Sequence, residues 1–243
     1  MPGRTFLILL LMLFSFEVFA SIDLPKNLTA GERERFLRIF GLGFAPTLSS
    51  YLVPLGGSEG AEVTLDYQTV QTREVSQLGA RSKAQPYTSI MGLTFAKGIF
   101  YNIDLSFSFN PGLQDENLKS YAAHGRWISD LRWDWPATFG FNIFAHGLQI
   151  QDKVSSRTVG FDFFAVYYID SLSIQAGVGS ARIIGSFTGG ADGVTDTGQN
   201  EPADVMAYRW FAGLGGRSGR LIWGAEAAQY ENLTLSGRIG FRF

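Results

Sequence analysis

The last eleven residues of the chain, from Leu233 to Phe243, alternate between two kinds of side chain. Leucine, isoleucine and phenylalanine, with Gly237 among them, occupy every second position, and threonine, serine, glycine and two arginines occupy the others. Successive side chains of a β-strand point to opposite faces, so one face is apolar and the other carries Arg238 and Arg242. Two arginines would be costly in a dry sandwich core, whereas a polar barrel lumen accommodates them. The stretch therefore predicts a strand that lies between lipid and a wet interior.

The same period of two recurs in nine earlier segments, most of them close to the about nine to eleven residues that a tilted membrane strand requires. They lie near residues 60–69, 86–97, 100–110, 120–132, 137–149, 157–169, 171–184, 205–215 and 219–229. The alternation falters after Gly147, where we predict a β-bulge. Residues 60–243 are therefore predicted to form an all-β membrane protein. The fold class is a closed antiparallel transmembrane β-barrel of about ten strands, with eight or twelve strands as the alternatives.

The connections between these segments alternate in length. Long connections are expected at 70–85, 111–119, 150–156 and 185–204, and short ones at 96–99, 133–136, 169–171 and 216–218. Outer-membrane barrels have short periplasmic turns and longer outer loops, so both chain ends are predicted to be periplasmic. Only the last connection, near 230–232, is too short for its side. Aromatic residues near the short turns are expected to form an interfacial girdle: Phe100, Tyr101, Trp133, Trp135, Tyr168 and Trp223.

The first twenty residues have the features of a secretory signal peptide. Arg4 gives a positive start, residues 6–16 form an apolar run, and Val18 and Ala20 fit the residues that precede a signal-peptidase cut. We therefore predict a signal peptide over residues 1–20, cleaved near Ala20. The sequence contains no cysteine, which excludes disulfides and thiolate metal sites.

Residues 21–59 are predicted to be a periplasmic N-terminal segment. Thr29 can cap a short amphipathic helix at about 29–40, with Glu32 in the capping-box position. An irregular, proline-containing linker then leads to the barrel. Three placements remain open: the segment plugs the barrel, covers its periplasmic mouth, or lies on the membrane surface. A short helix that only covers an apolar patch is the favoured interpretation.

Composition narrows the class of protein further. The formal net charge is −2, which gives no overall basic field for nucleic acid. The mean hydropathy is +0.07, and no second apolar run reaches the roughly 18 residues of a spanning helix. The chain nevertheless has 21 Phe and 29 Gly. Aromatic side chains suit the membrane interfaces of a barrel and glycines its curvature.

The C-terminal stretch resembles the closing strand of bacterial outer-membrane β-barrels, which typically ends in phenylalanine. Ile239, Phe241 and Phe243 occupy the positions of the signal that the barrel assembly machinery reads in such proteins. With the signal peptide and the strand pattern of residues 60–243, the chain resembles small Gram-negative barrels of the OmpA-like and OmpW-like class. The resemblance implies an outer-membrane location, and membrane lipid, lipopolysaccharide and the assembly machinery as partners. It implies no cofactor, no metal and no single activity.

The side chains expected to face the lumen carry nearly balanced charge. The set comprises Glu62, Asp66, Asp104, Arg126, Asp130, Arg132, Asp162, Arg209, Glu226, Arg238 and Arg242. A ten-stranded barrel is only slightly wider than the eight-stranded barrels that side chains fill, and isolated buried charges are costly. We therefore predict a charge-paired, largely closed lumen. Where the first and last strands meet, at least one arginine of the last strand should contact a carboxylate of the first.

Two histidines suggest a sharper hypothesis. If neighbouring strands meet at the predicted turns, Asp104, His124, His146 and Asp162 form one inward row. Such a row suits a divalent ion or general acid–base catalysis. Outer-membrane proteases called omptins also have ten strands and use Asp and His, but their motifs do not map onto this chain. Histidines in a structural polar network are the favoured alternative.

Three functions are therefore compatible with the sequence. The first is a structural or adhesion-type barrel with a closed lumen, which charge balance and size favour. The second is a narrow porin-like channel for small solutes or ions. The third is an outer-leaflet enzyme that depends on the histidine row.

Overall fold

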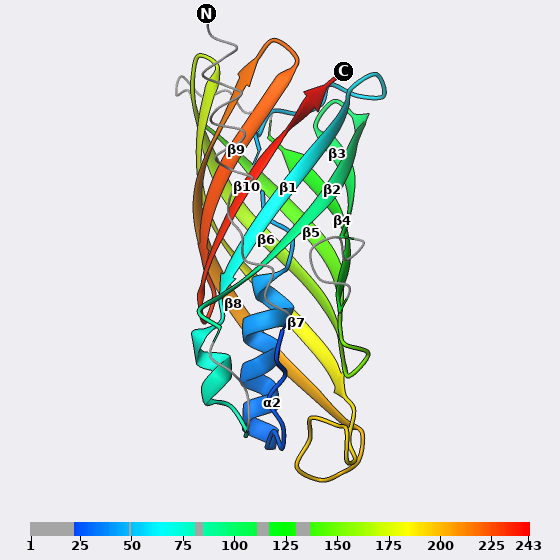
Figure 1. Ribbon diagram of the computed structural model, residues 1–243. Helices are drawn as coiled ribbons and strands as arrows, with labels where there is room; N and C mark the ends of the chain where they lie inside the picture. Colours follow the sequence, from blue (N-terminus) through cyan, green and yellow to red (C-terminus); the bar gives the residue numbers. More distant parts are fainter. Residues whose placement is uncertain (1–21, 49, 81–84, 111–116, 130–136) are drawn as a thin grey trace, which may run out of the picture.

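The computed structural model describes residues 22–48, 50–80, 85–110, 117–129 and 137–243, and these residues form a closed β-barrel of ten antiparallel strands (Figure 1). The strands are β1 Ala61–Gln71, β2 Tyr87–Phe100, β3 Ile103–Asn110, β4 Leu118–Ile128, β5 Ala137–Ile150, β6 Val154–Ile169, β7 Leu172–Phe187, β8 Glu201–Ser218, β9 Leu221–Gln229 and β10 Leu233–Arg242. Each strand pairs with its neighbours in sequence, and β1 pairs with β10 to close the barrel. The predicted fold class and strand count are confirmed, and each predicted segment overlaps one strand.

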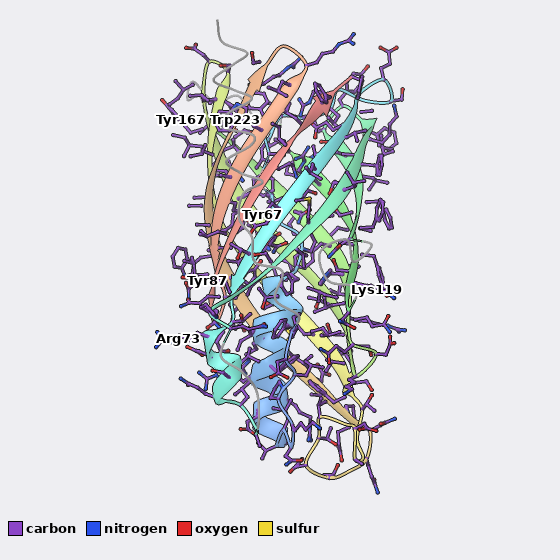
Figure 2. All side chains as sticks on the ribbon, in the orientation of Figure 1. Tyr67, Arg73, Tyr87, Lys119, Tyr167 and Trp223 are labelled. Atoms are coloured by element: carbon purple, nitrogen blue, oxygen red, sulfur yellow. The ribbon has the colours of Figure 1, made fainter. Side chains whose placement is uncertain are left out.

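The outer face of the barrel is apolar over its middle. Large apolar side chains stand exposed at alternate positions, among them Val159 at 64% and Phe163 at 56% accessibility. Tyr167 and Trp223 lie at a similar level near the end with the short turns, while Tyr87 lies toward the opposite end (Figure 2). An apolar band bounded by aromatic residues is the outer surface that a membrane-spanning barrel requires. Among the described residues, no helix is long and apolar enough to cross a membrane.

The predicted aromatic girdle is only partly in place. Phe100 and Tyr101 are exposed, as expected. Tyr168 instead points into the lumen, where its hydroxyl donates a hydrogen bond of 2.5 Å to the carbonyl oxygen of Leu52, so its predicted membership of the girdle is wrong. The neighbouring residue Tyr167 faces outward, because successive residues of a strand point to opposite faces. Trp133 and Trp135 lie outside the described residues.

The β-bulge predicted in β5 does not form. β5 keeps a continuous register with β6 up to Ile150, beyond Gly147. The alternation falters in the sequence because Leu148 and Ile150 face the lumen although they are apolar, and both are buried in the core. A register shift occurs instead in β2, between Gly98 and Phe100.

The N-terminal helix begins where the sequence predicts. α2 spans Ala30–Leu37, and a π-helical turn, η1, continues it over Arg38–Leu42. The Glu32 carboxylate accepts hydrogen bonds from the backbone N–H of Thr29 at 2.9 Å and from its hydroxyl at 2.7 Å, and the Thr29 side chain accepts one from the backbone of Glu32, so the predicted capping box is present.

The helix packs its apolar side against the inside of the barrel wall. Close approach requires glycine: a Cβ at Gly41 would lie 2.7 Å from Ile183, and one at Gly43 would lie 2.6 Å from Val70. The resulting apolar core joins helix and wall and includes Phe36, Leu37, Ile39, Phe40, Leu42, Val70, Ile150, Ile183, Phe187 and Val205. Burial of this size is the main attraction that holds the helix in place.

α2 fills a gap in the wall that we call the notch. β9 and β10 have 9 and 10 residues, whereas β7 and β8 have 16 and 18, and β9 pairs with β8 only from Trp210 onward. At the end with the β7–β8 loop, the wall between β8 and β1 is therefore incomplete, and α2 lies there beside the short 3₁₀ helix η2, Arg73–Gln77 (Figure 1).

Three arginines tie α2 to the borders of the notch. Arg33 pairs with Asp196 at 3.1 Å and with Glu201 at 3.7 Å, on the β7–β8 side. Arg35 pairs with Glu74 of η2 at 2.5 Å, and Arg35 and Arg38 approach Glu231 of the β9–β10 turn at 3.7 and 3.6 Å. The short connection near 230–232 therefore helps to hold the helix through Glu231.

Residues 22–48 and 50–55 lie along the inside of the barrel and in its notch. Lys26 exchanges backbone hydrogen bonds with Ala80, and the Leu28 N–H donates to Val194, so the segment starts among the long loops. It then passes through the lumen and reaches the opposite end, where the Gly98 N–H donates to the Gly60 carbonyl oxygen. α2 lies at the end opposite the short turns, so the predicted periplasmic helix and the predicted periplasmic short turns cannot both hold. The apolar side of α2 packs there against apolar residues of the barrel wall.

We expect the position of α2 to depend on pH through Glu32. Hydrogen bonds from the backbone N–H of Gly79, and then from Thr29, lower the pKa of Glu32 in the folded protein. A lowered folded pKa means that this stabilisation is present above the unfolded pKa of about 4.5 and is lost as pH falls through the folded value. The hydrogen-exchange protection factors of residues 29–37, which compare the measured rate with the intrinsic rate at the same pH, should therefore fall below about pH 4.5.

Two variants make this test specific. Glu32→Gln should exchange faster already at pH 7 and respond less to acid. Glu34→Gln should behave as the unmodified protein, since Glu34 is exposed and makes no ion pair within the described chain. Identical pH profiles for all three proteins would contradict the assignment.

Candidate functional site: the lumen and its inner segment

The lumen is occupied by residues 41–55, which we call the inner segment. Ser49 of this segment lies outside the described residues. Leu48 and Leu52 of the inner segment are buried, and they pack with wall residues in a second apolar cluster. The wall members of that cluster are Ile128, Phe164, Val166, Phe211 and Ala228. The centre of the barrel is therefore filled by the chain itself.

The described part of the lumen contains four arginine–carboxylate pairs. They are Arg242 with Glu62, Arg238 with Asp66, Arg126 with Asp104, and Arg209 with Asp162. The contact predicted across the closing seam between β1 and β10 is confirmed, and it occurs twice. Asp130 and Arg132 lie outside the described residues.

Arg209 is the most enclosed of these arginines. It is 3% accessible, and its partner Asp162, at 0%, receives a hydrogen bond of 2.5 Å from its Nε. A further nitrogen donates to the Tyr230 hydroxyl at 2.7 Å and to the carbonyl oxygen of Pro46 at 3.2 Å. The guanidinium also lies 5.0 Å from the ring centre of Phe144. One side chain thus joins the β6 and β8 walls to the inner segment.

Glu226 is the predicted lumen carboxylate that has no arginine within ion-pair distance among the described residues. It accepts a hydrogen bond of 3.0 Å from the backbone N–H of Leu48 and one of 3.2 Å from the Gln175 amide. The same Gln175 amide donates to the Leu48 carbonyl oxygen at 2.9 Å. Glu226 and Gln175 together hold both polar groups of one inner-segment residue.

The predicted row of two aspartates and two histidines is not assembled. His146 lies opposite Thr158 rather than Asp162, and Asp162 lies opposite Asn142. His124 lies opposite Ser106 on β3, two positions from Asp104. Both aspartates bind arginines, and neither histidine bonds a carboxylate within the described chain. The arrangement supplies no acid–base pair of the kind the hypothesis requires.

Two small cavities remain beside the inner segment. The larger, about 50 Å³, is lined in part by Asp66, Asn110, His146 and Arg238, and the smaller, about 20 Å³, includes His124. Ligand pockets usually measure about 300–1,000 Å³, so these cavities suit a few water molecules at most. Among the described residues, no group of three or more His, Cys, Asp or Glu side chains is placed to hold a metal ion.

Sequence reasoning missed the uncharged side chains that hold the inner segment. Gln68 donates hydrogen bonds to the carbonyl oxygens of Gly43 at 2.5 Å and Ala45 at 3.1 Å. Thr158, Tyr168 and Gln175 act in the same way at other levels. A signal was available, because a buried linker without regular structure must find partners for its backbone groups.

Comparison with known proteins adds little. No protein-family model matches the sequence, and no curated protein does. Among solved structures, the attachment invasion locus protein Ail of Yersinia pestis matches at 13% identity and a TM-score of 0.30, covering 76% of this chain and 98% of Ail. The N-terminal β-barrel domain of Pseudomonas aeruginosa OprF matches at 11% identity and 0.33, covering 77% and 99%.

The translocator domain of the autotransporter NalP from Neisseria meningitidis matches at 10% identity and a TM-score of 0.32, covering 88% of this chain and 94% of that domain. TM-scores this low support no functional inference.

We expect Arg242→Gln to destabilise the barrel strongly. The change leaves the Glu62 carboxylate, 3% accessible, without its charge partner, and stranding one member of a buried pair costs about 3–5 kcal/mol. The double variant Glu62→Gln/Arg242→Gln should recover a large part of that loss. Urea unfolding in lipid vesicles measures both, and equal losses in the single and double variants would contradict the pairing argument.

Proposed function

We propose that this protein is a bacterial outer-membrane β-barrel of the structural or adhesion type, closed by its own inner segment. The observation that carries the proposal is the path of residues 41–55 through the lumen, where wall side chains bond their backbone groups. The apolar outer band supports a position in the outer membrane, and so do the two long connections at one end of the barrel, 72–86 and 188–200.

The proposed orientation places the short turns and the C-terminus in the periplasm. The long β7–β8 loop, η2 and α2 then face outside the cell, where a barrel of this type presents the loops that contact its surroundings. Lys119 and the exposed Arg73 lie toward this end (Figure 2), where their positive charges suit lipopolysaccharide phosphates. Arg81 and Lys83 lie outside the described residues. Ile239, Phe241 and Phe243 at the end of the chain are proposed as the signal for the assembly machinery.

A channel is the weaker alternative. A ten-stranded barrel is narrow to begin with, and the inner segment takes up the centre of its lumen. Conduction would require the segment to leave. The enzyme alternative lacks support from geometry, since the carboxylates of the histidine row are held by arginines.

The closed state can be tested by conductance in planar bilayers. The unmodified full chain should give no stable conductance steps. Leu48→Asp/Leu52→Asp places two carboxylates in an apolar cluster where both leucines are at most 4% accessible, so it should displace the inner segment and produce steps.

The matched control for the conductance experiment is Ser58→Asp. Ser58 is exposed beside the Gly56–Gly57 turn, so the added charge should leave the bilayer record silent. Stable steps from the unmodified chain, equal to those of the double variant, would overturn closure by the inner segment.

The orientation has its own test. An epitope inserted at Gly190 in the β7–β8 loop should be labelled by antibody on intact cells, and an epitope inserted at Gly219 in the β8–β9 turn should not. Both glycines are exposed and have positive φ, 94° and 60°, so both sites tolerate insertion. The reverse pattern of labelling would invert the proposed topology.

A further inference from the structure

The barrel wall holds the inner segment mainly by its backbone. Eight wall side chains bond carbonyl oxygens or N–H groups of residues 41–55. They are Gln68, Asp104, Thr158, Tyr168, Gln175, Arg209, Glu226 and Arg242. They come from β1, β3, β6, β7, β8, β9 and β10, so the contacts surround the segment.

These contacts follow the segment from one end to the other. Near α2, the Thr158 hydroxyl donates to the Gly41 carbonyl oxygen at 3.0 Å. Near the short turns, Arg242 donates to the carbonyl oxygens of Tyr51 at 3.3 Å and Val53 at 3.2 Å. There, too, the Leu55 N–H donates to Asp104 at 3.1 Å. Backbone groups are the same in nearly every residue, so such bonds give affinity without reading sequence.

Side chains of the inner segment add a coarse pattern to this recognition. Phe44, Leu48 and Leu52 are 2%, 4% and 0% accessible, and they are spaced four residues apart. Phe44 lies in the cluster formed with α2, and the two leucines lie in the second cluster. Tyr51 and Val53, by contrast, are only partly buried. The wall thus has apolar receptors for every fourth residue, encloses residues 45–47 and Ser50 as well, and leaves room for variation at Tyr51 and Val53.

We propose that the lumen is a binding site for an extended polypeptide segment with apolar side chains at every fourth position. The inner segment is its resident occupant. A segment of another polypeptide with the same spacing would use the same wall side chains once the resident segment has left. This inference rests on the occupied lumen and is independent of the membrane in which the barrel resides.

The charged wall groups fit this role. Arg209 and Arg242 each bind a wall carboxylate and use further N–H donors for backbone carbonyl oxygens of the segment. Their charges are therefore balanced before a peptide binds. An uncharged peptide backbone completes the donors without adding net charge to the lumen, which favours extended polypeptide over a free anion or cation.

The test uses the full chain with a specific protease site in the exposed turn 56–58. The protein is folded in detergent micelles and then cut. The N-terminal fragment, which carries a fluorescent label, is expected to stay bound in the lumen. The cut protein is then unfolded in urea, refolded with an excess of a competing peptide and separated from free peptide. Competition takes place during folding, so slow release of the resident fragment does not hide the outcome.

Three peptides covering residues 43–55 decide the matter. The first keeps Phe44, Leu48 and Leu52 but carries Tyr51→Asn and Val53→Thr at the two partly buried positions. It should compete within about threefold of the native peptide, since backbone bonds and apolar contacts are retained. The second carries Leu48→Ser and Leu52→Ser and should compete on the order of 100-fold less well. The third has native side chains and an N-methyl group on Leu48, which blocks the bond to Glu226, and should compete about tenfold less well.

Each outcome bears on the proposal. If the first peptide fails to compete while the native peptide succeeds, the lumen reads one sequence and the proposal is overturned. If the serine peptide competes as well as the native one, the apolar side chains at every fourth position do not contribute to binding. If N-methylation has no effect, the backbone hydrogen bonds do not contribute. Loss of the labelled fragment without any competitor would instead contradict closure by the inner segment, which is the separate claim made above.

Discussion

Buried arginines that bind a wall carboxylate and a backbone carbonyl oxygen at once determine how this barrel is filled. A guanidinium has five N–H donors, more than one carboxylate can accept in a single plane. In Arg209 and Arg242, donors left over from the ion pair reach the inner segment. The ion pairs of the wall and the path of the segment therefore depend on each other. A wall without the segment would lose these hydrogen bonds and leave the donors to water, which would have to enter the lumen to satisfy them.

The same segment repairs the wall at the other end. The short β9–β10 hairpin leaves the notch open, and a row of unpaired backbone groups along β8 would then be exposed. α2 lies in the notch with ion pairs to its borders through Arg33, Arg35 and Arg38. Arg33 is buried against the β7–β8 border, whereas Arg35 and Arg38 lie on the partly exposed side of the helix and the apolar groups face the lumen. A single stretch of about forty residues thus serves as a wall element and as a plug, in that order along the chain.

Periodicity predicted the barrel because an alternating face is a local property of each strand. It could not predict which residues meet across strands. His146 was expected beside Asp162 but lies opposite Thr158, four residues away, and a slip by an even number of residues leaves every side chain on its predicted face. Register depends on the turns, which carry no periodic signal. The arginine–carboxylate contacts between β1 and β10 were predictable because both strands had clear ends and several charges to pair.

The path of the inner segment was hidden by its irregular structure, yet the wall contained the information. Val70, Leu148, Ile150 and Ile183 are apolar and face the lumen, all near the strand ends that join the long loops. Such residues are not expected in a water-filled pore, because apolar side chains that face water are not stabilised by burial. Inward apolar wall residues therefore indicate an apolar partner at their level of the barrel, and the second cluster, with Phe164, Val166 and Phe211, indicates one further along the lumen. At the end with the long loops the partner is the amphipathic helix that precedes the barrel. The alternation of β5 falters because Leu148 and Ile150 face this helix.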